Sequence, residues 1–564
     1  MSFQSKLIGY MSTIIQFKDI NVKEALLASS DVNPDGTREI SYAEAENSSL
    51  TGAQFKTAIN PNENNTNIVS FEELPYFKNL KLVTFTFRGC SNLKNIKVTP
   101  GLINSTYYGL FYDCAIEVLH LEDFTYLKCG HSNITNGNTK FGRLSSLKEI
   151  WIPNLELSEG NAFISSHVPN LEKIIVSSGE QWVSYRTTGN LDTRPSVSGK
   201  ASLYSINDLE HPITSLSTLS QAVPGVTTQP TVYAFTFAEL KNLTDITISA
   251  PNTVVEAGAF KDLPNTVTIH NFNYIVSTSN KIMGNNAFEN CKALGIETFP
   301  SGIQVVSDRG FYNSSLTEID SDNLLTINGY YSFSKSPLTS VKINGCTSVS
   351  NAINSFSDCK SLQYFSANSL QVITSGMFAG DTALTTVSIT SAIEIKDSAF
   401  VNCSQLSTID ATNVVTFGSE AFKGCSNLSN TGFNLSNAQF IGARCFNGCT
   451  NMVCPSDFQY LSSIGDSAFQ GGKCPTERYV IFRYQGIVNF MPSDIQALRY
   501  AINTFGTRNG QGITTIYVPY GNLTIEGVTK SYVQWYQEDT HWSQFISINN
   551  ITIVSLDING NVPT

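Results

Sequence analysis

A phenylalanine recurs along this chain at an almost constant spacing, and no other feature of the sequence constrains the fold as strongly. The step is 22 residues from Phe356 to Phe422, and it is 22 to 24 residues elsewhere between Phe288 and Phe469. A Cys often stands three residues after the Phe, and a Leu often stands six residues after it. A fixed period of this length predicts a solenoid, in which each repeat is one coil that buries its apolar side against the next coil.

One regular repeat, residues 391–412, shows how such a coil is expected to fold. Ile393 and Ile395 alternate with polar residues, which predicts a half-buried strand, and Ile409 lies in a second short strand. Phe400 is expected to point inward and to stack with the Phe of each neighbouring repeat. The predicted fold is therefore a mostly β, α+β leucine-rich-repeat solenoid with short strands.

The regularity of the repeats divides the chain into five predicted segments. They are 1–55, a small N-terminal preface similar to an EF-hand or dockerin calcium loop; 56–176, N-terminal repeats; 177–230, an insertion or irregular repeats rich in Ser, Thr and Pro; 231–474, leucine-rich repeats; and 475–564, a C-terminal capping region.

The capping region is predicted to begin with a helix at Ser493–Thr504 and to contain strands at Thr514–Pro519 and Ile551–Leu556. Between these strands lies a dense group of aromatic residues that includes Trp535 and Trp542. An end coil needs a cover, because its open face would otherwise associate with other chains. We expect the two tryptophans to form this cover, with glycan stacking as the alternative.

Composition argues against two classes of partner. Only 14% of the residues are charged, and the net charge of −11 is spread without long runs. Nucleic-acid binding rests on clustered Lys and Arg, which are missing here. No stretch approaches the roughly 18 apolar residues of a membrane span. We expect a neutral surface rich in hydroxyl and amide groups, with no nucleic-acid partner and no membrane insertion.

Several of the twelve cysteines occupy the third position after a repeat Phe. A Cys buried at such a position behaves as a small apolar residue. Cys445, Cys449 and Cys454 are close in sequence, and Cys474 follows further on. A zinc site would require a second pair facing the first, and the spacing supplies none. A structural role is therefore predicted, with zinc as the minor alternative.

A candidate calcium loop precedes the repeats. Asp31, Asn33 and Asp35 place oxygen ligands at alternate positions, and Gly36 permits the sharp turn of an EF-hand loop. The acidic residue that normally closes the loop at its twelfth position is replaced by Tyr42.

Glu44 can close this loop only if the loop accommodates two extra residues around Thr37–Glu39. In the alternative interpretation, Ser41 and Glu44 form a capping box at the start of a helix, and the preceding residues form an ordinary turn. The predicted ligand set is Asp31, Asn33, Asp35 and Glu44, and Ca²⁺ is the predicted cofactor.

The sequence contains no recognisable catalytic motif. Its six histidines form no HExxH pattern, and neither a Gly-x-Ser-x-Gly elbow nor a Walker-type loop occurs. Carboxylates such as Glu318, Asp320 and Asp322 are interpreted as solvated residues near turns. A glycosidase would require two carboxylates facing each other across a cleft, and no pair stands out. The prediction is a binding protein and not an enzyme.

Four segments resemble the BspA-like leucine-rich-repeat family, which is widespread in gut Bacteroidota and also occurs in phages that infect them. Ala399–Ile409 is similar to its core phrase, Phe71–Phe77 to its lead-in, Asp31–Glu46 to its preface, and Thr515–Pro519 with Tyr532–Phe545 to its closing phrase. The resemblance implies surface adhesion and interaction roles without agreed catalytic residues.

The first ten residues, MSFQSKLIGY, lack the apolar core and the cleavage site of an export signal. This feature predicts a bacteriophage virion protein of tail or fibre type that contacts a Bacteroidota host surface or other virion proteins. The alternative is a secreted or cell-surface bacterial adhesin. In either case the expected partner is a host-surface glycan or protein, the concave strand face is the expected contact surface, and an oligomer is compatible with the sequence.

Overall fold

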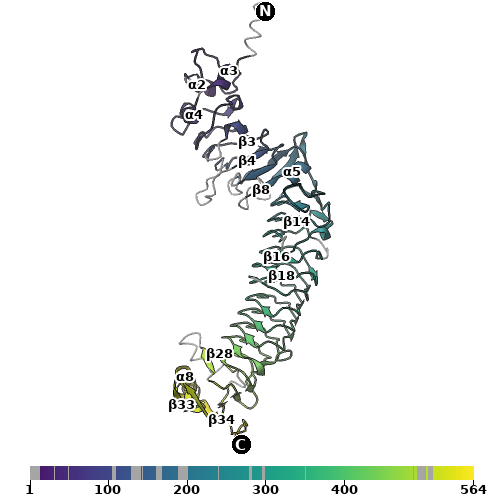
Figure 1. The fold of residues 1–564 in the computed structure, drawn as a ribbon, viewed down its shortest axis with the longest axis vertical. Helices are drawn as coiled ribbons and strands as arrows, with labels where there is room; N and C mark the ends of the chain where they lie inside the picture. The colour runs from purple at the N-terminus through teal and green to yellow at the C-terminus, as the bar shows by residue number, and fades with distance from the viewer. Residues whose placement is uncertain are drawn as a thin grey trace, which may run out of the picture. The chain divides into compact units, whose positions relative to one another are not determined.

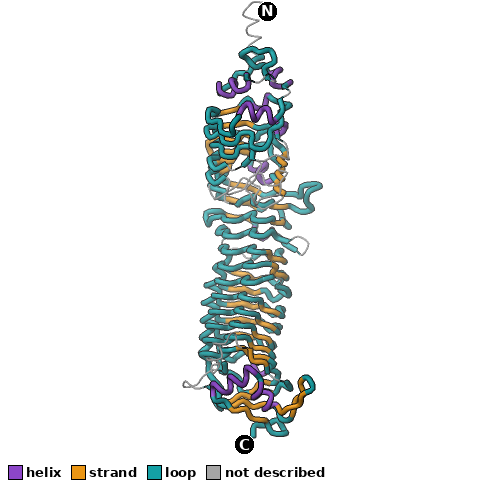
Figure 2. The backbone as a smooth tube through the Cα atoms, turned by 90° about the vertical axis from the view of Figure 1, so that its left-hand side faces the viewer, coloured by secondary structure: helices purple, strands orange, loops and turns teal. Residues whose placement is uncertain are grey.

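The computed structural model shows two compact units, residues 1–272 and residues 273–564. Each unit is built from coils that carry short strands, together with a few short helices (Figures 1 and 2). The structure describes residues 13–28, 30, 32–48, 50–103, 109–128, 141–142, 144–159, 168–188, 201–238, 240–278, 282–294, 299–349, 351–486, 488–491, 504–505 and 512–563.

In the first unit, three short helices precede a seven-stranded sheet of order β1-β2-β3-β5-β7-β9-β10. Smaller parallel sheets of order β4-β6-β8, β11-β13-β15 and β12-β14 accompany it. The elements are α2 (Ile20–Leu27), α3 (Tyr42–Asn47), α4 (Gly52–Ile59), β1 (Ser70–Phe71), η1 (Leu74–Tyr76), β2 (Asn95–Lys97), η2 (Pro100–Leu102), β3 (Val118–His120), β4 (Tyr126–Lys128), β5 (Glu149–Trp151), β6 (Leu157–Glu159), β7 (Lys173–Val176), α5 (Gly179–Ser184), β8 (Arg186–Thr188), β9 (Ser202–Ser205), β10 (Asp208–Pro212), β11 (Ser215–Ser217), β12 (Thr231–Val232), β13 (Asp245–Thr247), β14 (Val254–Val255) and β15 (Thr268–His270).

In the second unit, two parallel sheets dominate, with orders β17-β19-β20-β22-β24 and β21-β23-β25-β26-β28-β30. The elements are η5 (Phe272–Tyr274, which begins at the unit boundary), β16 (Val305–Ser307), β17 (Glu318–Asp320), β18 (Thr326–Asn328), β19 (Ser340–Lys342), β20 (Tyr364–Ser366), β21 (Val372–Ile373), β22 (Thr386–Ser388), β23 (Glu394–Ile395), β24 (Thr408–Asp410), β25 (Thr416–Phe417), η6 (Leu435–Asn437), β26 (Phe440–Ile441), β27 (Asp457–Phe458), β28 (Ser463–Gly465), β29 (Tyr479–Phe482), β30 (Asn489–Met491), β31 (Thr515–Val518), β32 (Asn522–Ile525), β33 (Val528–Ser531), α7 (Tyr532–Glu538), α8 (Thr540–Asn549) and β34 (Thr552–Ser555).

The recurring phenylalanines of the second unit form one stacked column. From Phe288 to Phe469, successive ring centroids lie 4.9–5.8 Å apart and successive ring planes differ by 2–19°. All of these rings are fully buried. The predicted stacking of Phe400 between Phe378 and Phe422 is therefore confirmed. We call this set the Phe column: Phe288, Phe311, Phe333, Phe356, Phe378, Phe400, Phe422, Phe446 and Phe469.

Each ring of the Phe column lies between two residues with left-handed backbone. The residue two places before the Phe and the residue two places after it have φ values between +49° and +84° in every coil of the column. Asn, Asp and Gly adopt this conformation most easily. Asn402 is one example and Gly424 is another. A Cβ on Gly424 would lie only 2.7 Å from Asn402 Oδ1, so this turn requires glycine.

The strands of neighbouring coils pair in parallel and in register. Thr386 pairs with Thr408, and Val387 pairs with Ile409. Ile409 and Ile395 are buried as predicted, whereas the predicted inward position of Ile393 is wrong, because its side chain is 49% exposed. Strand β23 contains only two residues, and Ile393 precedes it in the turn. A strand this short cannot bury a second residue by alternation.

The segment 177–230 is partly continuous with the repeats of the first unit. Strand β9 pairs in parallel with β7, with Lys173 opposite Ser202, so the chain extends the seven-stranded sheet after an interval. The chain then turns back as an antiparallel strand, β10. Strand β11 joins a separate parallel sheet with β13. Three short strands, β9, β10 and β11, therefore follow one another in this segment.

The C-terminal region contains the parallel sheet β27-β29-β31-β34 and an antiparallel hairpin, β32-β33. Trp542 is fully buried, lies 5.8 Å from the ring of Phe482, and donates from its indole N–H to the Val488 carbonyl at 2.6 Å. The predicted burial of Trp542 as part of a cover is confirmed. Strands β31 and β34 confirm the two predicted strands, whereas the predicted helix at Ser493–Thr504 lies outside the described residues except at its last position.

Candidate functional site

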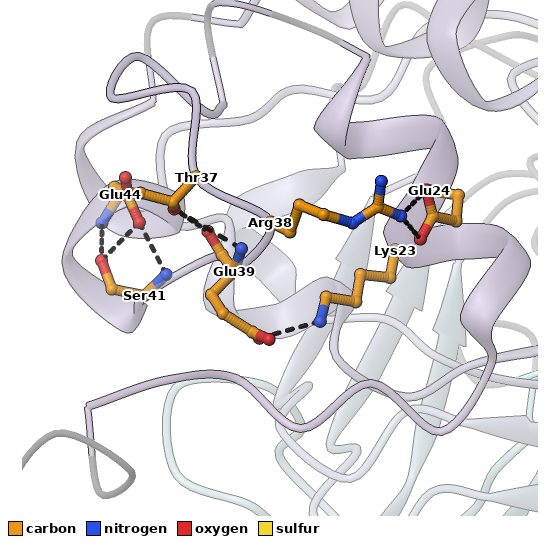
Figure 3. A network of polar contacts seen from close by, with 7 residues as sticks. All are labelled: Lys23, Glu24, Thr37, Arg38, Glu39, Ser41 and Glu44. Atoms are coloured by element: carbon orange, nitrogen blue, oxygen red, sulfur yellow. Dashed lines mark hydrogen bonds and ion pairs between the residues drawn. The ribbon is translucent and has the colours of Figure 1, made fainter. Parts of the chain in front are cut away.

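The predicted calcium loop connects helices α2 and α3 in the first unit (Figure 3). Asp31 lies outside the described residues. Asn33, Asp35 and Glu44 are described, and the structure shows how the side chain of each is engaged. These contacts decide how well the segment suits a cation.

Glu44 forms the capping box of α3. Its Oε2 accepts hydrogen bonds from the backbone N–H and the hydroxyl of Ser41, both at 2.7 Å, and the N–H of Glu44 donates to Ser41 Oγ at 3.2 Å. Such reciprocal bonds satisfy N–H groups that the first turn of a helix leaves unpaired. The helix-capping interpretation of Ser41 and Glu44 is confirmed.

The residues before α3 form a turn with one unsatisfied oxygen. Asp35 Oδ1 accepts from the N–H of Thr37 at 2.9 Å, and the carbonyl of Asn33 accepts from the N–H of Gly36 at 3.3 Å. The side-chain oxygen of Asn33, Oδ1, is enclosed and has no hydrogen-bond donor. A buried polar atom without a partner is unfavourable, and a cation would satisfy it.

The remaining acidic residues of this region are paired with basic residues (Figure 3). Lys23 binds Glu39 at 2.8 Å, and Arg38 binds Glu24 at 2.9 Å. Within the described ranges, no group of three or more His, Cys, Asp or Glu side chains is arranged to hold a metal ion. These residues therefore fit a calcium site only in part. Asn33 offers an unsatisfied oxygen, whereas Glu44 is already bonded to Ser41. Calcium binding stays a prediction.

Asp19 ties helix α2 to strand β1. Its carboxylate accepts hydrogen bonds from the backbone N–H groups of Asn21 at 2.9 Å, Val69 at 2.6 Å and Ser70 at 3.2 Å. Burial acts to raise the pKa of this carboxyl, but the three N–H donors outweigh burial and lower its pKa. The charged form of Asp19 therefore stabilises this end of the first unit.

In the second unit, the β17-β19-β20-β22-β24 sheet presents an ordered polar surface on its outward side. In each strand the middle residue is buried, and the residues on either side of it point away from the core, with Ser366 the one that is nevertheless buried. We call these outward residues the strand face: Glu318, Asp320, Ser340, Lys342, Tyr364, Ser366, Thr386, Ser388, Thr408 and Asp410.

Hydrogen bonds between coils hold the polar residues beside the strand face in rows. The hydroxyl of Thr339 donates to the Thr317 carbonyl at 3.1 Å, and the hydroxyl of Thr385 donates to the Gln363 carbonyl at 2.9 Å. On the other edge, the hydroxyl of Ser366 donates to Asn344 Oδ1 at 2.7 Å. Rows with a fixed spacing present donors and acceptors in a preorganised pattern, which lowers the entropy cost of binding.

Four of the ten residues of the strand face are charged: Glu318, Asp320, Lys342 and Asp410. Lys342 binds Asp320 at 3.1 Å, and this contact raises the pKa of the Lys342 ammonium. The sequence identified Glu318 and Asp320 only as turn residues, and it gave no contact residues for the predicted binding face. The positions of these strands could nevertheless have been derived from the sequence, because the buried middle residue of each strand follows the Phe of its coil by eight or nine positions.

A second neutral surface lies in the irregular segment of the first unit, beside β11. It is a hollow of about 570 Å³ whose lining is mostly small, neutral and partly hydroxylated. Glu180 is the one charged residue of the lining. The other lining residues are Gly179, Ser215, Leu216, Ser217, Thr218, Leu219, Ser220, Gln221, Ala222, Val223, Pro224 and Ser249. Such a lining suits a neutral ligand better than an anionic one.

The described cysteines are buried, and their chemistry is structural. Burial raises the pKa of the Cys90 and Cys346 thiols to about 11. It also raises the pKa of the Cys445 and Cys449 thiols well above the usual range. A thiol that stays protonated is a poor nucleophile and a poor metal ligand. The predicted structural role is confirmed.

In the C-terminal region, Trp535 is half-buried and its ring is already occupied. Its indole N–H donates to the Leu523 carbonyl at 2.8 Å, and the Lys530 ammonium lies 4.8 Å from the ring centroid. These contacts leave less of the ring available for a sugar than an open stacking platform would offer. None of the helices in the described ranges has the length and apolarity needed to cross a membrane.

The fold and the buried Phe and Cys positions define a leucine-rich-repeat protein. The family model for the BspA type leucine rich repeat region matches six copies, over residues 64–186, 230–363 and 352–476. These matches cover more than half of the sequence, so the chain belongs to the BspA-type leucine-rich-repeat family. Proteins of this family act in surface adhesion, which supports a binding role without catalysis.

Several solved structures resemble the chain. A leucine-rich repeat protein from Bacteroides ovatus is 16% identical, with a TM-score of 0.26 over 61% of this chain and 92% of the other. One from Eubacterium ventriosum is 15% identical, with a TM-score of 0.30 over 59% and 82%. A leucine rich cell surface protein from Faecalibacterium prausnitzii is 16% identical, with a TM-score of 0.27 over 62% and 84%. Values this low identify no ligand. No curated protein matches the sequence.

Proposed function

We propose that this chain is an adhesion protein that binds a surface glycan or a surface protein through its strand face. The observation that carries the proposal is the strand face itself, where parallel strands in register place polar side chains, half of them Ser or Thr, at the same positions from coil to coil. Membership of the BspA-type family supports binding as the role of the repeats.

The chemistry of the strand face favours a neutral partner. Hydroxyl groups such as those of Ser340, Thr386 and Thr408 both donate and accept hydrogen bonds, which suits sugar hydroxyls and peptide groups. Lys342 is the one basic residue of the strand face, and Asp320 neutralises it at 3.1 Å. A polyanionic partner would find little attraction here.

The experiment compares binding of the whole chain with binding of two matched variants. The first carries Thr386→Arg and Thr408→Arg on the strand face, and the second carries Thr416→Arg on the separate β21–β30 sheet. A glycan array and a pull-down from surface extracts of gut Bacteroidota would be probed with each protein, with and without a calcium chelator.

We expect the strand-face variant to lose at least tenfold in affinity while the Thr416→Arg variant binds as the native chain does. Equal binding by all three proteins would refute the strand face as the contact surface. Release of reducing ends from any polysaccharide on the array would contradict a role limited to binding.

The location of the protein is a separate proposal. The sequence predicted the virion of a phage that infects Bacteroidota, with the cell surface as the alternative, and family membership favours that alternative. Mass spectrometry of purified virions and of washed cell-surface fractions would distinguish the two. Absence from purified particles would eliminate the virion, and absence from the surface fraction would eliminate the cell-surface location.

A further inference from the structure

Asp381 occupies a position that the other coils of the Phe column fill with Cys or Ser, except for Gly472 in the last one. It stands three residues after Phe378, where the preceding coil has Cys359 and the following coil has Cys403. The Asp381 side chain is fully buried. An ionised carboxylate at such a position would be very unfavourable unless hydrogen bonds or a cation compensated its charge.

In the neighbouring coils, the side chain at this position donates a hydrogen bond to the Phe carbonyl of the preceding coil. The donors and acceptors are Ser336 Oγ to Phe311 O at 2.8 Å, Cys359 Sγ to Phe333 O at 3.3 Å, Cys403 Sγ to Phe378 O at 3.1 Å, Cys425 Sγ to Phe400 O at 3.0 Å and Cys449 Sγ to Phe422 O at 3.0 Å. In these five coils the position therefore supplies a donor to the preceding coil.

At Asp381 this donor is missing if the carboxyl is ionised. Asp381 Oδ1 accepts from the N–H of Cys359 at 2.8 Å, and the same N–H lies 3.3 Å from the Phe356 carbonyl oxygen. The second carboxyl oxygen, Oδ2, is enclosed and has no hydrogen-bond partner. An ionised carboxylate has no proton to donate. Its oxygens and the Phe356 carbonyl oxygen would then be acceptors that share one donor, the N–H of Cys359.

We propose that Asp381 is a neutral carboxylic acid in the folded protein, and that its Oδ2–H donates to the Phe356 carbonyl as the thiols of the neighbouring coils do. The stability of the second unit then depends on pH at one residue beside the Phe column, Asp381. When Asp381 loses its proton, the coil loses a hydrogen bond and gains a buried, unpaired charge.

The surroundings of Asp381 supply no compensating cation. The titratable residues that act on it are Asp358 and Cys359, both on the preceding coil. Burial, and to a lesser degree the Asp358 carboxylate, raise the pKa of Asp381 well above its ordinary value of 3.8, against the N–H bond from Cys359.

The sign of the pH effect follows from this direction. A pKa that is higher in the folded state than in the unfolded state contributes stability that is complete below the unfolded value. This contribution is lost as the pH rises toward the folded-state pKa. Within that window, each pH unit lowers the folding equilibrium constant by up to about tenfold.

The test measures chemical unfolding of the whole chain from about pH 4 to about pH 9, with hydrogen exchange to assign the transition to the second unit. The variants are Asp381→Asn, which keeps an acceptor and supplies a neutral donor, and Asp381→Cys, which restores the residue of the adjacent coils. Asp410→Asn, on the exposed strand face, is the matched control.

Both Asp381 variants are expected to be more stable than the native chain at neutral pH and to lose its decline toward high pH, whereas Asp410→Asn keeps that decline. In the infrared difference spectrum of native chain minus Asp381→Cys, we expect the carbonyl band of a protonated acid at neutral pH. A carboxylate band in that spectrum, or the native pH dependence in both Asp381 variants, would overturn the proposal.

Discussion

The coils of both units bury a recurring Phe, but the Phe rings are stacked more regularly in the second unit than in the first. In the second unit the rings of the Phe column stack with plane angles of 19° or less. In the first unit, Phe87 and Phe111 are tilted by 30°, whereas Phe111 and Phe141 are within 9° although 30 residues separate them in sequence. The number of residues between two Phe therefore does not determine how their rings stack, since 24 residues separate both the tilted Phe87–Phe111 pair and the stacked Phe422–Phe446 pair.

The left-handed backbone around the recurring Phe is common to both units. Phe111 lies between Gly109 and Asp113, which both have positive φ, as do the residues around each Phe of the Phe column. The same left-handed turn therefore occurs in both units, whereas the number of residues in a coil varies. Insertions in such coils cost little, because they lengthen surface loops without disturbing the buried column.

The largest expected effect is the loss of a ring from the Phe column. Phe400→Ala should lower the free energy of unfolding by about 3–5 kcal/mol, since the ring is fully buried and has a stacked neighbour on each side. Phe237→Ala in the first unit, where the neighbouring ring of Phe260 is tilted by 37°, provides the comparison. Chemical denaturation followed by segment-resolved hydrogen exchange would measure both, and a cost below about 1 kcal/mol at Phe400 would show that the column is not the core.

A smaller effect is expected when the backbone of a turn is altered. Gly424→Ala should cost about 1–2 kcal/mol, because the left-handed backbone disfavours a Cβ and Asn402 occupies the space. Ser398→Gly, at a left-handed position without glycine, should instead be neutral or stabilising by less than about 1 kcal/mol. Denaturation midpoints would report both values, and a stabilising Gly424→Ala would contradict the importance of the turn.

The helix caps of the first unit are expected to contribute less. Ser41→Ala should cost about 1 kcal/mol, because it removes the N-cap of α3. Glu44→Gln should cost almost nothing, since Gln also completes a capping box. If Glu44 also binds calcium, Glu44→Gln would abolish any rise in melting temperature that calcium produces in the native chain. An unchanged melting temperature of the native chain on chelation would argue against the predicted calcium site.

The two units should also respond to pH in opposite directions. The pKa of Asp19 is lowered, so its contribution is present above the unfolded value and is lost as the pH falls through the folded-state pKa. Asp381 behaves in the reverse sense. In acid, Asp19→Asn should remove part of the pH dependence of exchange in the first unit and leave the second unit unchanged. A pH dependence of the first unit that is identical in native chain and variant would contradict the role of the Asp19 carboxylate.

Much of the fold follows from sequence because burial repeats with the Phe. Phe400, Cys403 and Ile409 were placed correctly, since each buried position recurs in the same place in adjacent coils. Ile393 was placed wrongly, because alternation assumes a strand longer than the two residues of β23. The left-handed positions around each Phe are filled by Asn, Gly, Arg, Tyr, Lys, Asp, Ser and Glu, so composition alone did not reveal most of them.

The candidate sites were less accessible to sequence reasoning. Glu44 has two plausible uses in the sequence, and only the contact with Ser41 shows the one it has in this structure. The sequence predicted a strand face as the contact surface but did not identify its residues, because small polar side chains such as Thr386 belong to no recognisable motif. Asp381 was overlooked for a related reason: an Asp at the Cys position resembles a surface residue until its burial is known.

The most direct test of the account is a cross-linking measurement on the register of the coils. Thr386 and Thr408 are parallel partners on adjacent strands, whose backbones lie about 5 Å apart, within reach of a disulfide. A chain with Thr386→Cys and Thr408→Cys should form that disulfide rapidly under mild oxidation, while one with Thr386→Cys and Thr416→Cys should not, because Thr416 belongs to the other sheet. Cross-linking of the second pair as readily as the first, or of neither, would contradict coils stacked in register beneath a common strand face.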